Sequence, residues 1–297
     1  MDKRVQFDFE VVFSNGGGLD GQDFRLDIEG DDISDEALVD YIVRDLRLLM
    51  VGEVRILNKQ IITEAHKRTP INDGAKSSRY VDLSHIIEDG LVTYKGLPAP
   101  IICDYLSRED SRKFYEEGTE FQIGKLEMVA NTGTYIDCPF HRYPDGKDLS
   151  EVDLERFADL DAILIQADYR QHLAIDASFF ADKQLRGCAV LVHTGWGDAH
   201  WNTPLYYDNH PFLTADAAEY LKQAGVKLVG IDSHNIDDTR SKNRRPVHTI
   251  LLGAEILIVE HLCNLGVLPE QGFTFSAVPP KFKGMGTFPV RAFARLT

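Results

Sequence analysis

Apolar runs alternate with helical patterns along the C-terminal two thirds of the chain. Four apolar runs have the length and composition of buried strands, and they cover residues 162–167, 188–193, 227–232 and 255–259. Between these runs, residues 178–185 and 214–224 carry apolar side chains at helical spacing. Thr214 is a good N-cap for the second helix, and Gly225 is a typical helix stop. This alternation predicts a mixed α/β domain.

The first 75 residues have a pattern of their own, which predicts a strand-helix unit. Alternation of apolar and polar residues predicts strands at residues 5–13, 24–28 and 54–62, with a turn at the glycine run 15–18. Ser34 is a good N-cap for a helix whose apolar stripe consists of Leu38, Ile42, Leu46 and Leu49, with Gly52 just past its end. A turn at residues 70–74 marks the expected boundary, so we predict an N-terminal extension over residues 1–75 and a main domain over residues 76–297.

Composition and charge limit the classes of partner. The chain has 297 residues and a formal net charge of -15, which argues against binding to nucleic acid or to an anionic membrane. No apolar run approaches the ~20 residues that cross a bilayer, and the N-terminus lacks the apolar core of a signal peptide. The four cysteines are scattered, as in reduced cytoplasmic proteins. We therefore expect a cytoplasmic protein that acts on a small molecule.

One segment, residues 131–141, concentrates side chains that can carry out chemistry. If it is extended, Asn131, Tyr135, Asp137 and His141 point to the same side, because side chains on a strand alternate between faces. Pro139 removes a hydrogen-bond donor from the strand, so we expect the strand to end or bend there and to present His141 at its rim.

The same segment resembles the signature of the cyclase family of amide hydrolases, His-x-Gly-Thr-His-x-Asp-x-Pro-x-His, with Asn131 and Tyr135 in place of two histidines. That family includes bacterial kynurenine formamidase and isatin hydrolase. A second match is the stretch His248-Thr-Ile-Leu-Leu, together with Glu260, which stands twelve residues after His248. Further matching segments are Asp82–His85, Val192–Trp196, Val226–Asp232 and Phe288–Ala292, so the resemblance covers residues 78–297. It implies a swivelling β/β/α fold with a mixed sheet.

The resemblance also implies a catalytic site. Asp137, His248 and Glu260 match metal ligands of the family, and together they suit a zinc or manganese ion. His141 matches the general base and proton shuttle. Because the family's other two ligand histidines are replaced by Asn131 and Tyr135, we expect weaker metal binding than at a complete site.

Three functions fit these residues. The first is hydrolysis of a C–N amide bond in a small molecule, linear or cyclic, such as an aromatic formamide or a lactam. The second is a metal-free lyase or isomerase in which Tyr135, Asp137 and His141 carry out acid-base chemistry. The third is a non-catalytic binding protein on the same scaffold. Retention of His141, His248 and Glu260 favours an enzyme over the third.

Several residues outside the two motifs are candidates for substrate binding. Asn131 shares the motif face, His193 and His234 stand at the ends of predicted strands, and Trp196 could stack on a planar substrate. The basic run at residues 240–245 is either a solvated loop or a grip for a substrate carboxylate. For the assembly, the family resemblance implies a homodimer or a tetramer, and we expect the stripe of Leu38, Ile42 and Leu46 to need a partner.

Overall fold

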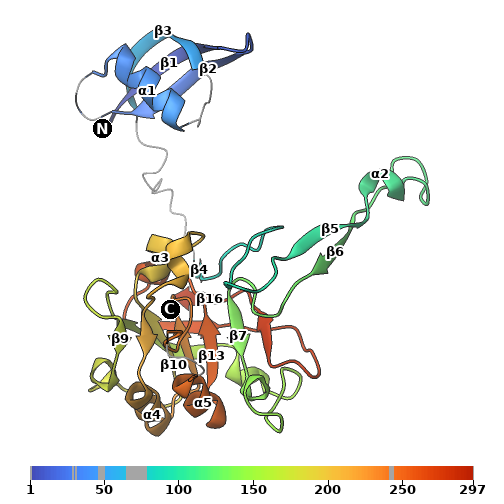
Figure 1. Cartoon of the computed structure of the whole chain (residues 1–297), viewed down its shortest axis with the longest axis vertical. Coiled ribbons are helices and arrows are strands. Elements are labelled where there is room, and N and C mark those ends of the chain that lie inside the picture. Colours follow the sequence, from blue (N-terminus) through green and yellow to red (C-terminus); the bar gives the residue numbers. More distant parts are fainter. Residues whose placement is uncertain are drawn as a thin grey trace. The chain divides into compact units, whose positions relative to one another are not determined.

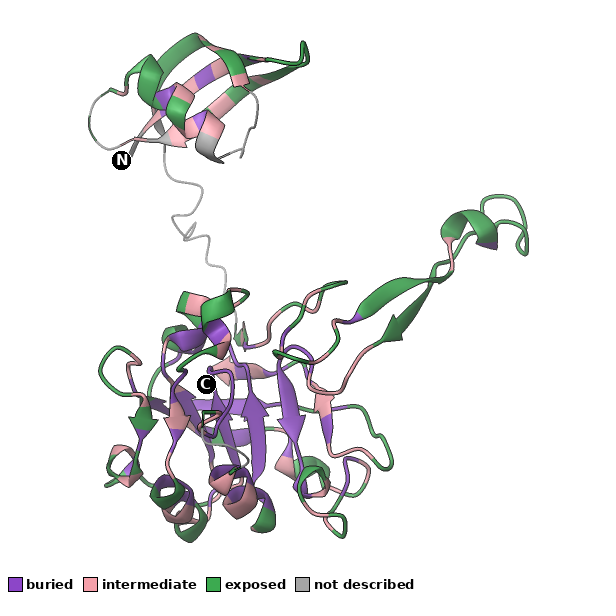
Figure 2. Cartoon of the chain, viewed as in Figure 1, coloured by how far each residue is buried: buried purple, intermediate pink, exposed green. Residues whose placement is uncertain are grey.

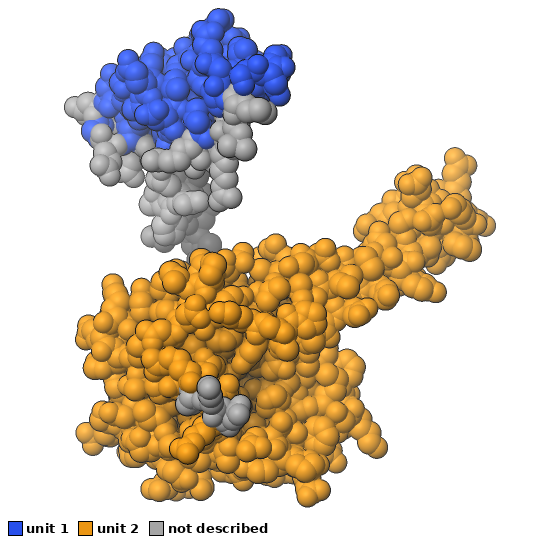
Figure 3. All heavy atoms as spheres, in the orientation of Figure 1, with its two compact units in different colours: residues 1–75 blue, residues 76–297 orange. Residues whose placement is uncertain are grey.

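The computed structural model describes residues 2–28, 30, 32–45, 51–64, 79–240 and 244–296. The chain divides into two units, Met1–Ala75 and Lys76–Thr297, which Figure 3 colours separately. The turn predicted at residues 70–74 lies outside the described residues.

A three-stranded antiparallel sheet with one helix forms the first unit. Its strands are β1 (Asp2–Phe13), β2 (Gly18–Asp27) and β3 (Val51–Glu64), in the order β2-β1-β3, and its helix is α1 (Asp35–Asp45). Ser34 caps α1, since its Oγ accepts a hydrogen bond from the backbone N–H of Ala37 at 3.2 Å. Gly52, predicted to follow the helix end directly, is the second residue of β3.

The apolar stripe of α1 is already covered within this unit. Leu38 and Ile42 are buried in a core with Val5, Phe7, Phe9 and Val11 of β1. The prediction that these two residues need a partner chain is therefore wrong, because their own sheet supplies the apolar surface. Leu46 and Leu49 lie outside the described residues.

A mixed sheet of nine strands organises the second unit (Figure 1). Four parallel strands match the predicted apolar runs: β8 (Leu160–Gln166), β10 (Ala189–His193), β12 (Leu228–Ile231) and β13 (Leu257–Glu260). Antiparallel strands extend it at both ends, namely β7 (Tyr135–Asp137) and β15 (Thr287–Pro289) beyond β13, and β14 (Phe273–Ser276), β16 (Phe293–Leu296) and β4 (Tyr80–Asp82) beyond β8. The predicted mixed α/β fold is confirmed.

Both faces of this sheet are buried at its centre, where Figure 2 shows the strands mainly as buried residues. Helices α4 (Ala215–Ala224) and α5 (Pro246–Gly253) contribute to one of the two cores, which is why the parallel strands are apolar throughout. As predicted, Thr214 caps α4, and Gly225 ends it with a left-handed φ of 76°.

The helix predicted over residues 178–185 is wrong. Only the short 3₁₀ helix η3 (Ala177–Phe180) forms there, capped by Asp176. Phe180 is fully buried, and Asp182 adopts a φ of 61°, which an α-helix cannot accommodate.

The remaining short elements are β9 (Ala174–Ile175), β11 (Phe212–Leu213), α3 (Trp196–His200) and the 3₁₀ helices η1 (Pro139–His141), η2 (Leu154–Arg156), η4 (Pro204–Tyr207) and η5 (Leu265–Val267).

An arm made of β5 (Ile101–Leu106), α2 (Arg108–Ser111) and β6 (Ile123–Glu127) extends away from the sheet (Figure 1). Its two strands pair only with each other. Large apolar side chains on it are exposed, including Tyr105 at 77% and Phe114 at 73%. Among the described residues, no helix has the length and apolar character needed to span a membrane.

Candidate active site

The motif segment is extended only in part. Strand β7 contains Tyr135–Asp137, whereas Gly133 has a left-handed φ of 66° and Pro139 begins η1. The predicted alternation from residue 131 to 141 therefore holds only over β7, because Gly133 turns the chain beforehand. Pro139 ends the strand as predicted, and His141 lies at the rim with a side-chain exposure of 34%.

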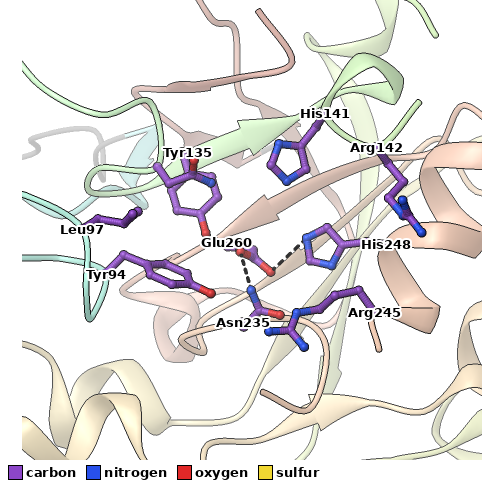
Figure 4. Close-up of a pocket in the computed structure, with 10 residues that line it drawn as sticks. Tyr94, Leu97, Tyr135, His141, Arg142, Asn235, Arg245, His248 and Glu260 are labelled. Carbon is purple, nitrogen blue, oxygen red and sulfur yellow. Dashed lines mark hydrogen bonds and ion pairs between the residues drawn. The ribbon is translucent and has the colours of Figure 1, made fainter. Parts of the chain in front are cut away.

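A pocket of about 460 Å³ brings the two matched regions together (Figure 4). Residues from β7, η1, α5 and β13 and from three loops line it: Tyr94, Leu97, Asn131, Tyr135, His141, Arg142, Asn235, Arg245, His248 and Glu260. A volume of this size suits a small molecule.

Asp137 lies completely buried beside this pocket, held by the neighbouring strand. It pairs directly with Thr287 across β7 and β15, and the Thr287 hydroxyl donates to its Oδ1. The same Thr287 oxygen lies 2.7 Å from Nδ1 of His141. Since its single proton goes to Asp137, Thr287 accepts the Nδ1–H of His141, so in the neutral imidazole Nε2 is the nitrogen that carries the free lone pair.

His248 is oriented by a carboxylate that the sequence analysis did not single out. Its Nδ1 lies 2.6 Å from Oδ2 of Asp237, and Asp237 also accepts the backbone N–H groups of Val247 and His248 at the start of α5. Nε2 of His248 therefore faces the site, 3.6 Å from Oδ2 of Asp137 and 3.7 Å from Oε1 of Glu260. Against burial, which lowers the pKa of His248, the neighbouring carboxylates of Asp137 and Asp237 raise that pKa to about 10.

Glu260 and Tyr135 stand directly opposite each other on β13 and β7. The Tyr135 hydroxyl donates to Oε2 of Glu260, and the backbone N–H of Ile236 donates to Oε1 at 2.6 Å. Burial, together with repulsion from Asp137, raises the pKa of Glu260 to about 7. Burial and the charge of Glu260 raise the pKa of Tyr135 well above its usual value, so Tyr135 remains a proton donor.

The residues at this site fit a divalent cation. Donor atoms of Asp137, His141 and His248 all lie within 4.8 Å of one another. Oδ2 of Asp137 is buried without a hydrogen-bond partner among the described residues, which is the condition expected of an oxygen reserved for a cation. The Asp237–His248 contact is the carboxylate–imidazole arrangement that commonly supports metal-bound histidine. Glu260, predicted as the third ligand, is close to His248 but falls outside this closest set.

Comparisons with known proteins identify the scaffold. The Cyclase family model matches residues 81–238. This chain belongs to the cyclase family. Kynurenine formamidase from Bacillus anthracis is 27% identical over 221 residues, which cover 74% of this chain and 99% of that protein. Kynurenine formamidase from Geobacillus thermodenitrificans is 32% identical over 180 residues, 60% of this chain and 82% of that protein.

A solved structure shows the same fold. Isatin hydrolase A from Labrenzia aggregata superimposes with a TM-score of 0.63 at 19% identity, over 73% of this chain and 93% of that one. The predicted cyclase-type fold is thereby confirmed. Against the family signature, this cyclase-family chain places Asn131 and Tyr135 in the pocket where histidines are usual.

Three of the predicted substrate-binding residues lie outside this pocket. Trp196 is buried in packing, where its Nε1 donates to the carbonyl of Tyr206 at 3.0 Å. His193 lines a separate hollow and lies 2.7 Å from Gln166, because β10 ends at a different part of the sheet edge. His234 is buried behind the pocket wall, with its ring 4.6 Å from that of Tyr94. Asn131 does line the pocket.

The structure adds residues that sequence reasoning missed. Tyr94, Leu97, Arg142 and Asn235 line the pocket, Asp237 holds His248, and Thr287 holds Asp137. Of the basic run, Arg245 reaches the pocket, whereas Arg240 pairs with Asp238 at 2.9 Å.

Proposed function

We propose that this protein hydrolyses a C–N amide bond in a small molecule, linear or cyclic, with aromatic formamides and lactams as the first candidates. The convergence of Asp137, His141, His248 and Glu260 on one pocket carries the proposal. Membership of the cyclase family and the similarity to kynurenine formamidases support it.

The chemistry calls for a divalent metal, zinc or manganese, held by Asp137, His248 and Glu260. When bound there, such an ion polarises the amide carbonyl and makes the attacking water more acidic. Asp237 accepts the Nδ1–H of His248, so Nε2 is the nitrogen that would give up its proton to bind the ion, and Tyr135 keeps the Glu260 carboxylate in place through its hydroxyl.

His141 moves the protons in this proposal. Its Nδ1–H is held by Thr287, and Thr287 is held in turn by Asp137, so the free Nε2 can accept a proton from water. The same nitrogen then returns that proton to the leaving nitrogen of the amide. Asn131 offers an amide group for hydrogen bonds to the substrate, whereas the Asn235 amide donates to Oε2 of Glu260 at 3.4 Å and helps to hold that carboxylate.

The test uses protein purified without chelator. Elemental analysis should find a divalent ion, and the protein should hydrolyse an aryl formamide or a lactam. Asp137→Asn and His248→Ala should lose both metal and activity, whereas His172→Ala, an exposed residue away from the pocket, should keep both. A metal-loaded protein that hydrolyses no amide would contradict the proposal.

We also propose that two copies associate through the arm of β5, α2 and β6. A two-stranded ribbon is only marginally stable by itself, and exposed apolar clusters mark interaction surfaces. Besides Tyr105 and Phe114, the arm exposes Ile101, Ile102, Phe121, Ile123 and Leu126. Light scattering should give a dimer or a tetramer, and Tyr105→Glu should shift it to monomers. A wild-type monomer at micromolar concentration would contradict this assembly.

A further inference from the structure

A second hollow lies at the carboxyl edge of the sheet, apart from the catalytic pocket. It has a volume of about 410 Å³, and the ends of β8 and β10 and the start of α3 line it. None of its lining residues also lines the pocket of His248. Crevices at the carboxyl ends of parallel strands are common ligand sites in α/β proteins, so this hollow is a candidate for a second ligand.

His193 presents a lone pair to this hollow. Its Nδ1 lies 2.7 Å from Oε1 of Gln166, an oxygen that can only accept, so Nδ1 carries the proton. Nε2 of the neutral ring is therefore an acceptor. Gly266 of η5 packs closely against the same ring, since a Cβ at Gly266 would be 3.1 Å from Cε1 of His193. These contacts fix the orientation of the imidazole.

Two carboxylates face Nε2 of His193 without reaching hydrogen-bond distance. Oδ2 of Asp198 and Oδ2 of Asp232 each lie 3.9 Å from this nitrogen. Asp232 is buried beneath the hollow, where its Oδ1 accepts the N–H and the hydroxyl of Thr194 and its Oδ2 accepts the N–H of Gly195. Since a carboxylate has about four acceptor sites, one remains on Oδ2, the atom that faces His193.

Three acceptors therefore face one another, and the described part of the chain brings no donor between them. Within that part, neither Asp198 nor Asp232 pairs with a lysine or an arginine. Arg170 lines the hollow, but its Nε and Nη2 already bind Asp168 at 2.9 and 2.8 Å. A water molecule has two hydrogens for three acceptors, whereas a primary ammonium group has three N–H donors and a positive charge.

We propose that this hollow binds a small organic primary amine, whose ammonium group donates to His193, Asp198 and Asp232. The volume of the hollow suits a small molecule. The ring of Tyr169 and the methyl group of Ala199 offer an apolar surface for the carbon chain of the amine. Such an amine is protonated at neutral pH, because its pKa is about 10, like that of lysine. The site is independent of the proposed amide hydrolysis.

The test observes the hollow directly and needs no turnover. n-Butylammonium and its neutral counterpart n-butanol are titrated into the full chain, and nuclear magnetic resonance records the backbone amide of Gly195 and the Cε1–H of His193. Butylammonium should shift both signals saturably, with a dissociation constant in the millimolar range, whereas butanol should shift neither.

A pair of variants tests the role of the carboxylates. Asp198→Asn should weaken butylammonium binding about 5- to 10-fold, the effect of one charged hydrogen bond at a half-exposed group. Asp161→Asn is the matched control and should bind as the wild type does, since Asp161 is an exposed aspartate of β8 that does not line the hollow.

Other outcomes would overturn the inference. Equal shifts with butanol would mean that the hollow is only an apolar surface, and the absence of saturable shifts would assign it to water. Equal affinity in Asp198→Asn and Asp161→Asn would mean that the acidic protein attracts the cation without a specific site. A lysine of a second copy would supply the same ammonium group, so light scattering is measured with and without butylammonium. Dissociation of an assembly by butylammonium would make the hollow a subunit contact and not a site for a free amine.

Discussion

Asp237 accepts the Nδ1–H of His248 at 2.6 Å, and this contact determines which imidazole nitrogen faces the pocket. The same carboxylate accepts the backbone N–H of Val247 at 2.8 Å and so also caps α5. One buried side chain thus sets both the start of the helix and the tautomer of the histidine that it carries.

Asp237→Asn should weaken metal binding about 10- to 100-fold, because the amide can offer an N–H where His248 needs an acceptor. Calorimetric titration of zinc or manganese into chelator-treated protein measures the affinity. Asp238→Asn is the control, since Asp238 is the next residue and pairs with Arg240 instead. Unchanged metal affinity in Asp237→Asn would mean that His248 does not need this orientation.

His141→Ala should lower kcat about 10²- to 10⁴-fold, the usual cost of losing a general base. The protein should stay folded with its metal content unchanged, because the side chain is 34% exposed and contributes little to the core. Steady-state kinetics, thermal unfolding and elemental analysis are measured on the same preparation. Loss of metal along with activity would make His141 a ligand, which the grouping of Asp137, His141 and His248 also permits.

The elements that the sequence predicted well are those whose signal is local. The parallel strands β8, β10, β12 and β13 are largely buried on both faces, so apolar residues dominate each of them. Helix α4 carries its start and stop signals at Thr214 and Gly225. Residues 178–185 failed because the left-handed conformation of Asp182 leaves no trace in apolar periodicity.

Contacts between distant segments explain what the sequence missed at the site. Thr287 acts through its pairing with Asp137, 150 positions away, and such a register cannot be derived from either segment alone. Asp237 stands in a loop, and only the packing of that loop on α5 brings it to His248. Trp196 and His193 lie outside the pocket of His248, because the position of a residue near a strand end does not reveal which hollow it faces.

Restoring the family histidines tests whether their loss weakened the site. Asn131→His combined with Tyr135→His should tighten zinc binding, since imidazole is a better ligand than an amide oxygen or a neutral phenol. Calorimetry compares the double variant with Tyr135→Phe, which removes the hydroxyl held by Glu260 without supplying a ligand. Affinity no higher than that of the wild type would show that the pocket already holds its metal without these histidines.

Acid should destabilise the protein through histidines whose pKa is lowered by burial, among them His85 and His234. Burial lowers the pKa of His85 to about 4, and burial with nearby basic groups lowers that of His234 to about 2. Because an unfolded histidine has a pKa near 6.5, the unfolded chain binds more protons below that pH. The stability that these histidines contribute should therefore be present above about pH 6.5 and fall as the pH drops towards 4, and the raised pKa values of Glu260 and His248 offset part of that fall because they favour the folded state in acid. Urea unfolding between pH 4 and 7 measures this slope.

His85→Phe should flatten that slope, since a phenyl ring can replace the imidazole stacked on Trp201 without binding a proton. His172→Gln, at an exposed site, is the control and should leave the slope unchanged. An identical pH dependence in wild type and His85→Phe would assign the acid sensitivity to other groups.

Gly286 should be intolerant of any side chain, because it lies against the backbone that positions His141. A Cβ at Gly286 would be 2.2 Å from the backbone N of His141 and 2.5 Å from its Cα, and neither atom can rotate away. Gly286→Ala should therefore push η1 away from β15 and misplace His141, with a loss of about 10²-fold in kcat and about 1–3 kcal/mol in stability. Gly124→Ala in β6, where the nearest atom is the side-chain Nε2 of Gln122 at 3.5 Å, is the matched control. Kinetics and thermal unfolding of both variants decide the matter: full activity in Gly286→Ala would show that the site does not depend on this close approach.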